Sequence, residues 1–255
     1  MKLSVVTVAY NAAATIGATC ASVAATAAAG MDLEHVVIDG ASSDGTLEAI
    51  APFRGGLACL VSEPDAGLYD AMNKGLGLTS GEYVAFLHAD DVYADPTAVM
   101  RMVEVLMASG ADAGYADLEV VDGGGRVVRV WRGGPYREGA FRWGWMPPHP
   151  TFIARRTALL AAGGFNTTFK FSADYELMLR LMHREGIQVV YHPEVLVRMR
   201  AGGVSNATWQ GRWRAHREDW NAWSINGLRP APWTLPLKPL RKISQFRCWP
   251  FTFET

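Results

Sequence analysis

The sequence lacks long apolar runs and paired cysteines. No run approaches the roughly 20 apolar residues that a membrane-spanning helix requires, and Lys2 is followed by a strand too short and too β-branched for a signal peptide. The three cysteines, Cys20, Cys59 and Cys248, are scattered and show no metal-ligand spacing. We therefore expect a cytoplasmic protein with reduced thiols and no zinc site.

Strong net charge, internal repeats and low-complexity linkers are also missing. The formal net charge is −1 and no nucleic-acid-binding motif is present, so we expect no nucleic-acid partner. The chain does contain 49% apolar residues among its 255 positions. This is enough for the core of one large α/β domain with an appendage.

Short apolar strands alternate with helical stretches through about residue 110, which is typical of a doubly wound, mostly parallel sheet. An alanine-rich helix is expected over residues 12–29, and a second helix over 97–108 with Asp95-Pro96 at its start. After it, a glycine-rich turn between two apolar segments predicts a hairpin. The predicted strands are residues 3–9, 35–38, 57–61 and 83–87, with hairpin strands at 111–121 and 126–131.

Carboxylates stand where two of these strands end. Asp39 ends the second strand, and Asp90 and Asp91 follow the fourth. In an open α/β sheet, ligands collect beyond the carboxyl ends of the strands. Mg²⁺ or Mn²⁺ is held by one or two carboxylates and completes its shell with phosphate oxygens and water. The acidic pair therefore predicts a metal site that meets a phosphate, with a solvated turn as the alternative for such a dipeptide.

Six motifs follow one another along almost the whole chain: Thr7 to Asn11, Asp39 to Thr46, Ser62 to Gly75, Asp90-Asp91, Pro148 to Phe152 and Ser172 to Leu177. In this order they closely resemble the family 2 glycosyltransferases. These are inverting enzymes of the GT-A fold, and the resemblance extends to members of bacterial cell-envelope polysaccharide biosynthesis. One motif departs mildly from the family pattern, because the sequence often written Asp-x-Asp is represented here by Asp90 and Asp91.

The resemblance implies transfer of a sugar from a nucleoside diphosphate sugar, with a UDP-sugar favoured, to a hydroxyl of a lipid-linked saccharide or polysaccharide. It also implies a Rossmann-like GT-A catalytic domain over residues 1–205, with helices flanking a mostly parallel central sheet. Residues 1–110 would form the nucleotide-sugar-binding half and residues 111–205 the acceptor-binding half.

By the same resemblance, Asp91 would hold the Mg²⁺ or Mn²⁺ that bridges the donor diphosphate, and Asp174 would be the general base that takes the acceptor proton. Ser172 is expected to cap the helix that begins near Ala173. His149 would lie on the acceptor side, with a structural histidine as the alternative. The expected donor-nucleotide residues are Thr7, Ala9, Tyr10, Asn11, Asp39, Asp65, Lys74 and Asp90.

Three of these donor residues have distinct expected roles. Asp39 would accept a hydrogen bond from the N–H of uracil, thymine or guanine, which cytosine lacks. Asp90 would lie near the ribose. Lys74 would neutralise phosphate or contact the nucleotide, although a surface lysine on an amphipathic helix fits the sequence about as well.

The last fifty residues, 206–255, form a helical tail of different character. It holds six of the nine tryptophans and eight Lys or Arg against three Asp or Glu. Because tryptophan favours the membrane–water interface and basic residues favour anionic lipid, the tail is expected to rest on the inner membrane. A tryptophan stripe packed on the catalytic domain, or on a partner in a homo-oligomer, is the alternative. The stripe consists of Trp209, Trp213, Trp220 and Trp223.

Two other functions share part of this pattern. A sugar-1-phosphate nucleotidyltransferase would be expected to carry a glycine-rich N-terminal loop, whereas the loop here runs from Ala9 to Ala12 without glycine. A non-catalytic nucleotide-binding scaffold would not need both Asp91 and Asp174. The sequence therefore favours the glycosyltransferase.

Overall fold

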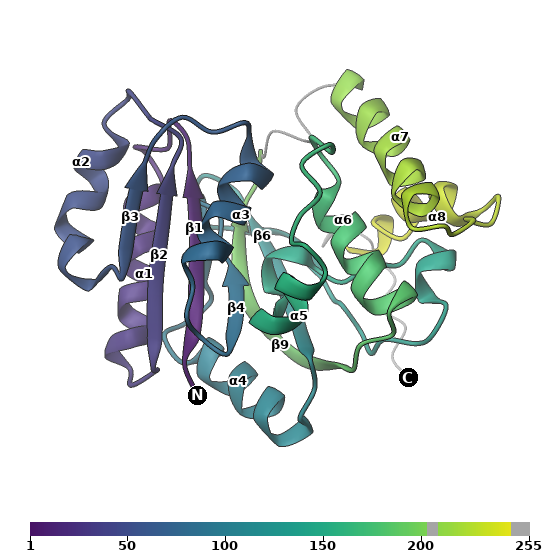
Figure 1. Ribbon diagram of the computed structural model, residues 1–255, viewed down its shortest axis with the longest axis horizontal. Helices are drawn as coiled ribbons and strands as arrows, with labels where there is room; N and C mark the ends of the chain where they lie inside the picture. Colours follow the sequence, from purple (N-terminus) through teal and green to yellow (C-terminus); the bar gives the residue numbers. More distant parts are fainter. Residues whose placement is uncertain (203–208, 246–255) are drawn as a thin grey trace.

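The computed structural model describes residues 1–202 and 209–245, with residues 209–213 and 244 described by their backbone alone. Within these ranges, nine strands form one sheet that has helices on both faces (Figure 1). The strand order is β3-β2-β1-β4-β8-β6-β9-β5, and β7 also pairs with β6.

The element bounds follow the predicted alternation of strands and helices. The strands are β1 Leu3–Ala9, β2 Leu33–Asp39, β3 Cys59–Ser62, β4 Tyr83–Phe86, β5 Asp91–Tyr93, β6 Ala113–Val121, β7 Val127–Trp131, β8 Ile153–Arg155 and β9 Val189–Arg200. The α-helices are α1 Ile16–Ala28, α2 Thr46–Ile50, α3 Leu68–Leu78, α4 Ala98–Ser109, α5 Arg156–Ala161, α6 Ala173–Met178, α7 Trp209–Ile225 and α8 Thr234–Leu240. The remaining helical turns are η1 Ala51–Gly56, η2 Ala140–Trp143, η3 His149–Thr151, the π-helical η4 Leu179–Arg184 and η6 Ile243–Gln245.

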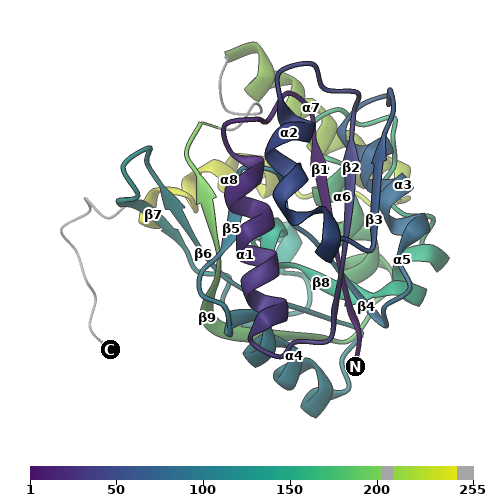
Figure 2. The same ribbon diagram turned by 90° about the vertical axis from the view of Figure 1, so that its left-hand side faces the viewer.

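The N-terminal half of the sheet is parallel. β1 pairs with β2 and β4, and β2 pairs with β3. Every residue of β1 is buried, since helices α1 and α3 lie on opposite sides of this part of the sheet (Figure 2). Burial on both faces explains why the segment reads as a nearly continuous apolar run rather than an alternating one.

The other half of the sheet is mixed. β8 runs antiparallel to both β4 and β6, and β9 runs parallel to β6 but antiparallel to β5. The predicted hairpin is confirmed, because β6 and β7 pair antiparallel across the glycine-rich turn. The predicted α/β fold, a sheet flanked by helices with a helical C-terminal part, is confirmed as well.

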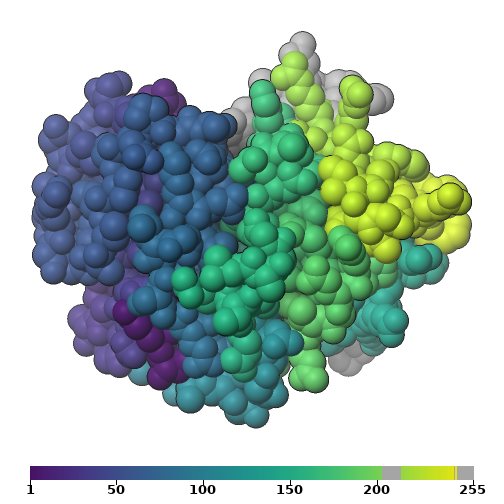
Figure 3. Space-filling view, viewed as in Figure 1, coloured from purple at the N-terminus to yellow at the C-terminus, as the bar shows by residue number. Residues whose placement is uncertain are grey.

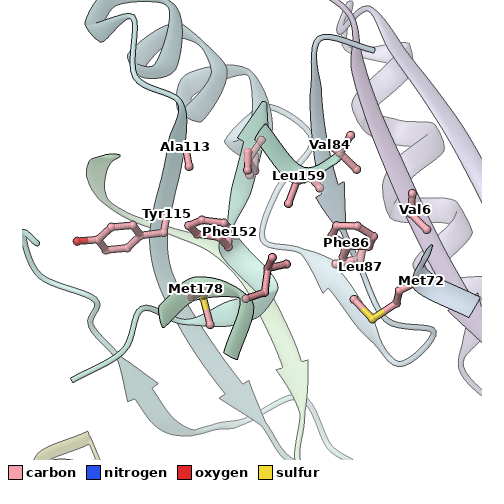
Figure 4. Packing of buried hydrophobic residues seen from close by; sticks show 14 of the residues in the cluster. Val6, Met72, Val84, Phe86, Leu87, Ala113, Tyr115, Phe152, Leu159 and Met178 are labelled. Atoms are coloured by element: carbon pink, nitrogen blue, oxygen red, sulfur yellow. The ribbon is translucent and has the colours of Figure 1, made fainter. Parts of the chain in front are cut away.

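Both halves share one hydrophobic core, which includes residues from Leu3 to Trp223. Phe86 and Leu87, at the end of β4, face Val6 of β1 and Met72 of α3 (Figure 4). On the other side of β4 the same core continues through Tyr115, Phe152 and Met178. Continuous packing of this kind fixes the two halves relative to each other.

Helix starts differ from the expected ones. α1 begins at Ile16, four residues later than the expected start. α4 begins at Ala98, and Thr97 takes the N-cap position. Asp95 instead closes a turn, in which it accepts hydrogen bonds from the backbone N–H and the hydroxyl of Thr97 at 2.8 Å each. Gly110 ends α4 in the left-handed conformation, as its place after the helix predicts.

The described part of the tail packs on residues 111–205, where α7 contacts α6 and α8 contacts η2 (Figure 3). Trp223 is fully buried and donates its indole N–H to the hydroxyl of Tyr175 at 2.9 Å, whereas Trp220 is 50% exposed. The side chains of Trp209 and Trp213 lie outside the described residues. At least one tryptophan of α7, Trp223, therefore packs in the core instead of facing solvent.

Two further expectations concern single features. Cys20 and Cys59 are free thiols, and Cys248 lies outside the described residues. Among the residues that the structure covers, no helix combines the length and the apolar character needed to cross a membrane.

Two glycines of α3 provide a test of the packing between α3 and β1. A Cβ at Gly75 would overlap Cγ1 of Val6, whereas a Cβ at Gly77 would meet open space. We expect Gly75→Ala to lower the free energy of unfolding by about 1–3 kcal/mol through overpacking. Gly77→Ala should raise it by up to about 1 kcal/mol through helix propensity. Thermal unfolding of both variants checks this, and equal melting temperatures would contradict it.

Candidate active site

Asp91 opens β5, and its carboxylate is buried without a partner. The residue is 1% exposed, and neither carboxylate oxygen has a hydrogen-bond partner within the described residues. Burial and the charge of neighbouring Asp90 raise the pKa of Asp91 well above its usual range, which the backbone amide of Arg200 only partly offsets. A buried carboxylate in this state is costly unless a cation or a proton compensates it.

The Asp91 carboxylate fits a divalent cation. Carboxylate oxygens are preferred ligands of Mg²⁺ and Mn²⁺, and one cation would satisfy both unpaired oxygens. In the described ranges, no three His, Cys, Asp or Glu side chains lie together as a ready metal cage. Asp91 would therefore hold the ion together with water and substrate oxygens. Asp90 is exposed beside it.

Asp39 ends β2 as a fully buried carboxylate that is well supplied with donors. It accepts hydrogen bonds from the backbone N–H of Ser42 at 3.0 Å, from the Ser42 hydroxyl at 2.5 Å and from the Ser62 hydroxyl at 2.6 Å. Since each carboxylate oxygen offers two lone pairs, acceptor capacity remains on Oδ1. Its position at the strand end matches the one expected for nucleobase recognition.

The loop after β1 lies beside Asp39. Ala9, the last residue of β1, pairs with Asp39, and the ring of Tyr10 that follows is 69% exposed. Asn11 adopts a left-handed backbone conformation with φ of 48°, and its side chain accepts a hydrogen bond from the backbone N–H of Ser43 at 3.1 Å. The exposed ring of Tyr10 is thus presented at a loop whose backbone is fixed.

Two other expected donor residues engage neighbouring protein groups. The Thr7 hydroxyl lies 2.9 Å from Nε2 of His35, and both residues are buried. Burial lowers the pKa of His35 to about 4, so its imidazole is neutral at pH 7. Asp65 accepts a hydrogen bond from the backbone N–H of Gly67 at 2.8 Å, which orders the loop before α3.

Lys74 projects from α3 into a set of ion pairs. Its ammonium lies 3.0 Å from Glu63 and 3.5 Å from Asp70, and it also donates to the backbone carbonyl of Pro64 at 3.1 Å. The two carboxylates balance the positive charge of Lys74. A role in binding phosphate would require the ammonium to leave these partners.

Asp174 lies in the first turn of α6, where two side chains from distant segments meet its carboxylate. The Tyr69 hydroxyl donates to Oδ1 at 3.3 Å, and Nδ1 of His149 lies 3.2 Å from Oδ2. Burial and the Asp174 charge raise the pKa of Tyr69, so the phenol keeps its proton and can donate it in a hydrogen bond. The carboxylate is thus oriented on both oxygens.

His149 is neutral at physiological pH. Burial lowers its pKa to about 4, and the charge of Asp174 offsets only part of this effect. A carboxylate can only accept, so the neutral imidazole fits this contact with its proton on Nδ1. The lowered pKa leaves Asp174 with an aligned partner that does not neutralise it.

His88 connects the acidic pair with Asp174. Its ring centroid lies 6.2 Å from that of His149, and the charges of Asp90 and Asp174 both act on it. Burial is nevertheless the larger effect and lowers the pKa of His88. His88 thus lies near both Asp90 and Asp174, although 84 positions separate these two residues in the chain.

The expectation that Ser172 caps α6 is wrong. Its hydroxyl donates instead to the carbonyl of Ala215 in α7 at 3.2 Å. Glu218, also in α7, accepts hydrogen bonds from the backbone N–H groups of Lys170, Phe171 and Ser172. The carboxylate of Glu218 therefore holds the segment that leads into α6, and the Ser172 hydroxyl makes no capping hydrogen bond.

Sequence reasoning assigned no role to several groups around Asp174. Tyr69 belongs to the Ser62 to Gly75 motif and His88 stands two residues before Asp90, but nothing in their local sequence reveals that they lie near Asp174. Trp131 was treated as the end of a hairpin strand, and its ring lies 6.3 Å from that of His149. Only the pairing of β6 with β7 and β8 brings this ring to the site.

The fold and these carboxylates define a glycosyltransferase, and the comparisons with known proteins agree. Residues 4–177 match the model of the family described as Glycosyl transferase family 2. The chain belongs to this family. Over 182 residues it is 33% identical to an uncharacterized glycosyltransferase of Mycobacterium tuberculosis, MT1564, with 70% of this chain and 68% of that protein covered. It is 27% identical to a PGL/p-HBAD biosynthesis glycosyltransferase of Mycobacterium bovis, covering 69% and 68%.

Solved structures confirm the GT-A glycosyltransferase fold. Residues 1–349 of S. aureus TarS, in complex with UDP-GlcNAc, superpose with a TM-score of 0.69 at 18% identity. The match covers 89% of this chain but 65% of that one, so this chain spans about two thirds of the TarS fragment. The mannosyltransferase PcManGT of Pyrobaculum calidifontis, in complex with GDP-Man and Mn²⁺, gives a TM-score of 0.65 at 21% identity, covering 94% and 68%.

The unpaired Asp91 carboxylate leads to a stability prediction. Because its pKa is raised in the folded state, ionisation of Asp91 destabilises the metal-free fold as pH rises through that pKa. We expect Asp91→Asn to raise the free energy of unfolding at pH 7 by about 1–3 kcal/mol. Thermal unfolding in chelator measures this as an increase of about 2–4 °C per kcal/mol.

The same variant at low pH is the control. Near pH 4 the wild-type carboxyl is protonated, so the difference between the two proteins should shrink. A stability gain that is the same at pH 4 and pH 7, or no gain at all, would contradict the unpaired state of Asp91.

Proposed function

We propose that this glycosyltransferase moves a sugar from a nucleoside diphosphate sugar to an acceptor hydroxyl with inversion at the anomeric carbon. The observation that carries the proposal is the oriented carboxylate of Asp174, which shares one site with the acidic pair at the end of the nucleotide half. Inverting transfer requires a single base on the acceptor and stabilisation of the leaving diphosphate. The site offers one group for each task.

The donor would lie along the carboxyl edge of β1, β2 and β4. Asp39 would accept from the nucleobase, Tyr10 would pack on the nucleoside and Asp90 would lie near the ribose. The acceptor capacity of Asp39 favours uracil, thymine or guanine over cytosine. TarS was solved with UDP-GlcNAc and PcManGT with GDP-Man, and a UDP-sugar remains the favoured donor for this chain.

Asp91 would hold Mg²⁺ or Mn²⁺, which supplies charge neutralisation for the departing diphosphate. In the transfer step, an oxygen of Asp174 takes the proton of the acceptor hydroxyl. The hydroxyl oxygen then forms the bond to the anomeric carbon while the bond from that carbon to the diphosphate oxygen breaks. Tyr69 and neutral His149 orient the Asp174 carboxylate during this step and keep their own protons.

The acceptor is proposed to be a saccharide carried on a lipid or a growing polysaccharide. A relative in PGL/p-HBAD biosynthesis and one in succinoglycan biosynthesis support this class. The protein also has an exposed apolar surface for membrane contact, which we call the Trp143 patch. It consists of the rings of Trp143 and Trp233, which stack at 5.7 Å and are 56% and 48% exposed, and of Arg241, whose guanidinium donates to the Trp143 carbonyl.

Separate roles for Asp91 and Asp174 can be measured directly. Calorimetry of UDP, GDP, TDP and CDP, each with Mn²⁺ and with chelator, should identify one nucleotide whose binding requires metal. Asp91→Asn should lose this binding. Asp174→Asn should retain a dissociation constant within about threefold of wild type but lose roughly 10²–10⁴-fold in donor turnover, the usual contribution of a general base.

The exposed Asp32 directly precedes β2, at the opposite end of that strand from Asp39. It offers a matched control, since Asp32→Asn should keep both binding and turnover. Equal loss of nucleotide binding in the Asp91 and Asp174 variants would contradict the division of labour. If no nucleotide bound to the wild type with metal or with chelator, the donor site itself would be wrong.

The Trp143 patch makes the membrane proposal testable. Because two exposed tryptophans and a basic side chain would insert at the lipid interface, we expect binding to anionic liposomes in sedimentation at physiological salt. The double variant Trp143→Ser/Trp233→Ser should weaken this binding at least fivefold. Trp220→Ser, on the exposed face of α7, serves as the control for a tryptophan outside the patch. Failure of the wild type to sediment with the liposomes would overturn the membrane contact.

A further inference from the structure

Three cations gather beside Asp174 from segments that the donor site does not use. Arg129 comes from β7, Lys238 from α8, and Lys242 from the turn between α8 and η6. η6 contacts β7, and the segment after α8 runs beside that strand in Figure 2. The charges of Lys238 and Arg129 both act on Lys242, so the three side chains lie near one another. We call these three residues the cationic cluster.

Two of the three cations lack an anionic partner. Lys238 is paired with buried Asp219 at 2.7 Å and lies 3.8 Å from the ring centroid of Tyr175. Nε of Arg129 is buried without a hydrogen-bond partner in the described part of the chain. Lys242 has no carboxylate within ion-pair distance there. Burial and the other cations lower the pKa of Lys242, and the charges of Asp219 and Asp174 offset only part of this effect.

The cluster is anchored next to the base. The guanidinium of Arg129 lies over the ring of Trp131 at 5.5 Å, and that ring contacts His149, which in turn faces Asp174. Lys242 and Lys238 act electrostatically on His149, and Lys242 also acts on Asp174. The cations therefore lie near the pair formed by His149 and Asp174.

The metal carboxylate lies farther away. Across the sheet, Asp91 pairs with Met199, Met199 with Val120, and Val120 with Arg129, so Asp91 and Arg129 share one row on the same face. Three strand spacings separate their Cα atoms by about 14 Å. Asp90 is the charge that acts on Asp91, and none of the three cations does so. This separation leaves room for a second anion at the cationic cluster while a diphosphate is held at Asp91.

We propose that Arg129 and Lys242, supported by Lys238, bind an anionic group of the acceptor, a phosphate or a carboxylate close to the hydroxyl that attacks. The proposal rests on the transfer reaction above, because it names the class of acceptor that this site would take. A guanidinium on an aromatic ring with a nearby ammonium matches the two-oxygen face of either anion. The acceptor would thus be a phosphorylated or an acidic saccharide rather than a neutral one.

Anion binding without metal tests the proposal apart from the donor site. Inorganic phosphate and glucuronate are titrated by calorimetry into the full chain in chelator, where no metal-bound anion contributes. We expect one equivalent of at least one anion to bind. Arg129→Gln and Lys242→Gln should each weaken this binding at least tenfold. Arg126→Gln, an 87% exposed arginine on the same hairpin that is paired with Asp122, should leave it unchanged.

Two further arms separate the donor site from the acceptor site. The anion should still bind to Asp91→Asn, and to wild type saturated with UDP and Mn²⁺. Stronger binding of phosphate would identify a phosphorylated acceptor, and stronger binding of glucuronate an acidic sugar. Absence of binding, competition by UDP, or unchanged binding in both cluster variants would overturn the proposal. Loss of UDP binding alone would count against the donor site and leave the anion site supported.

Discussion

The pairing of β4 with β8 is the interaction on which the site depends. β4 is bonded to β1 on one side and to β8 on the other, so it joins the parallel half of the sheet to the mixed half. The chain beyond β4 carries the acidic pair, and η3 with His149 leads directly into β8. Because backbone hydrogen bonds fix the register, the segment after β4 with His88 and Asp90 lies near His149 and Asp174.

Much of the nucleotide half could be predicted because its signals are local. Buried parallel strands read as apolar runs, and the polar residues that follow them mark the edge where ligands collect. Asp39 and Asp91 were located from this pattern, and the structure places both at strand ends. Resemblance to known enzymes added Asp174, whose role has no signal in the spacing of the chain itself.

The surroundings of Asp174 could not be predicted, since they are made by contacts between residues far apart in sequence. Tyr69 reaches it from α3 and His149 from η3, and no local pattern records either contact. The Ser172 cap failed for the same reason: the serine hydroxyl donates to the carbonyl of Ala215, which lies 43 residues later in the chain. The tail was interpreted from its tryptophans alone, yet Trp223 is fully buried in the core.

The site holds charges that the protein leaves uncompensated. Within the described residues, Asp91 is buried without a hydrogen-bond partner, and Arg129 and Lys242 are partly buried without a carboxylate at ion-pair distance, which makes the ligand-free fold less stable than it could be. Ligands of opposite charge would recover this free energy on binding. The free energy that these charges cost the ligand-free protein would therefore add to the binding affinity for ligands of opposite charge.

The Glu218 carboxylate has a consequence for how the protein is made. It satisfies the backbone amides that lead into α6, but it lies 46 residues after Ser172 in the chain. During synthesis on the ribosome, the helix that carries Asp174 emerges well before the side chain that secures its start. The segment that leads into α6 therefore gains these hydrogen bonds only after α7 has folded back onto it.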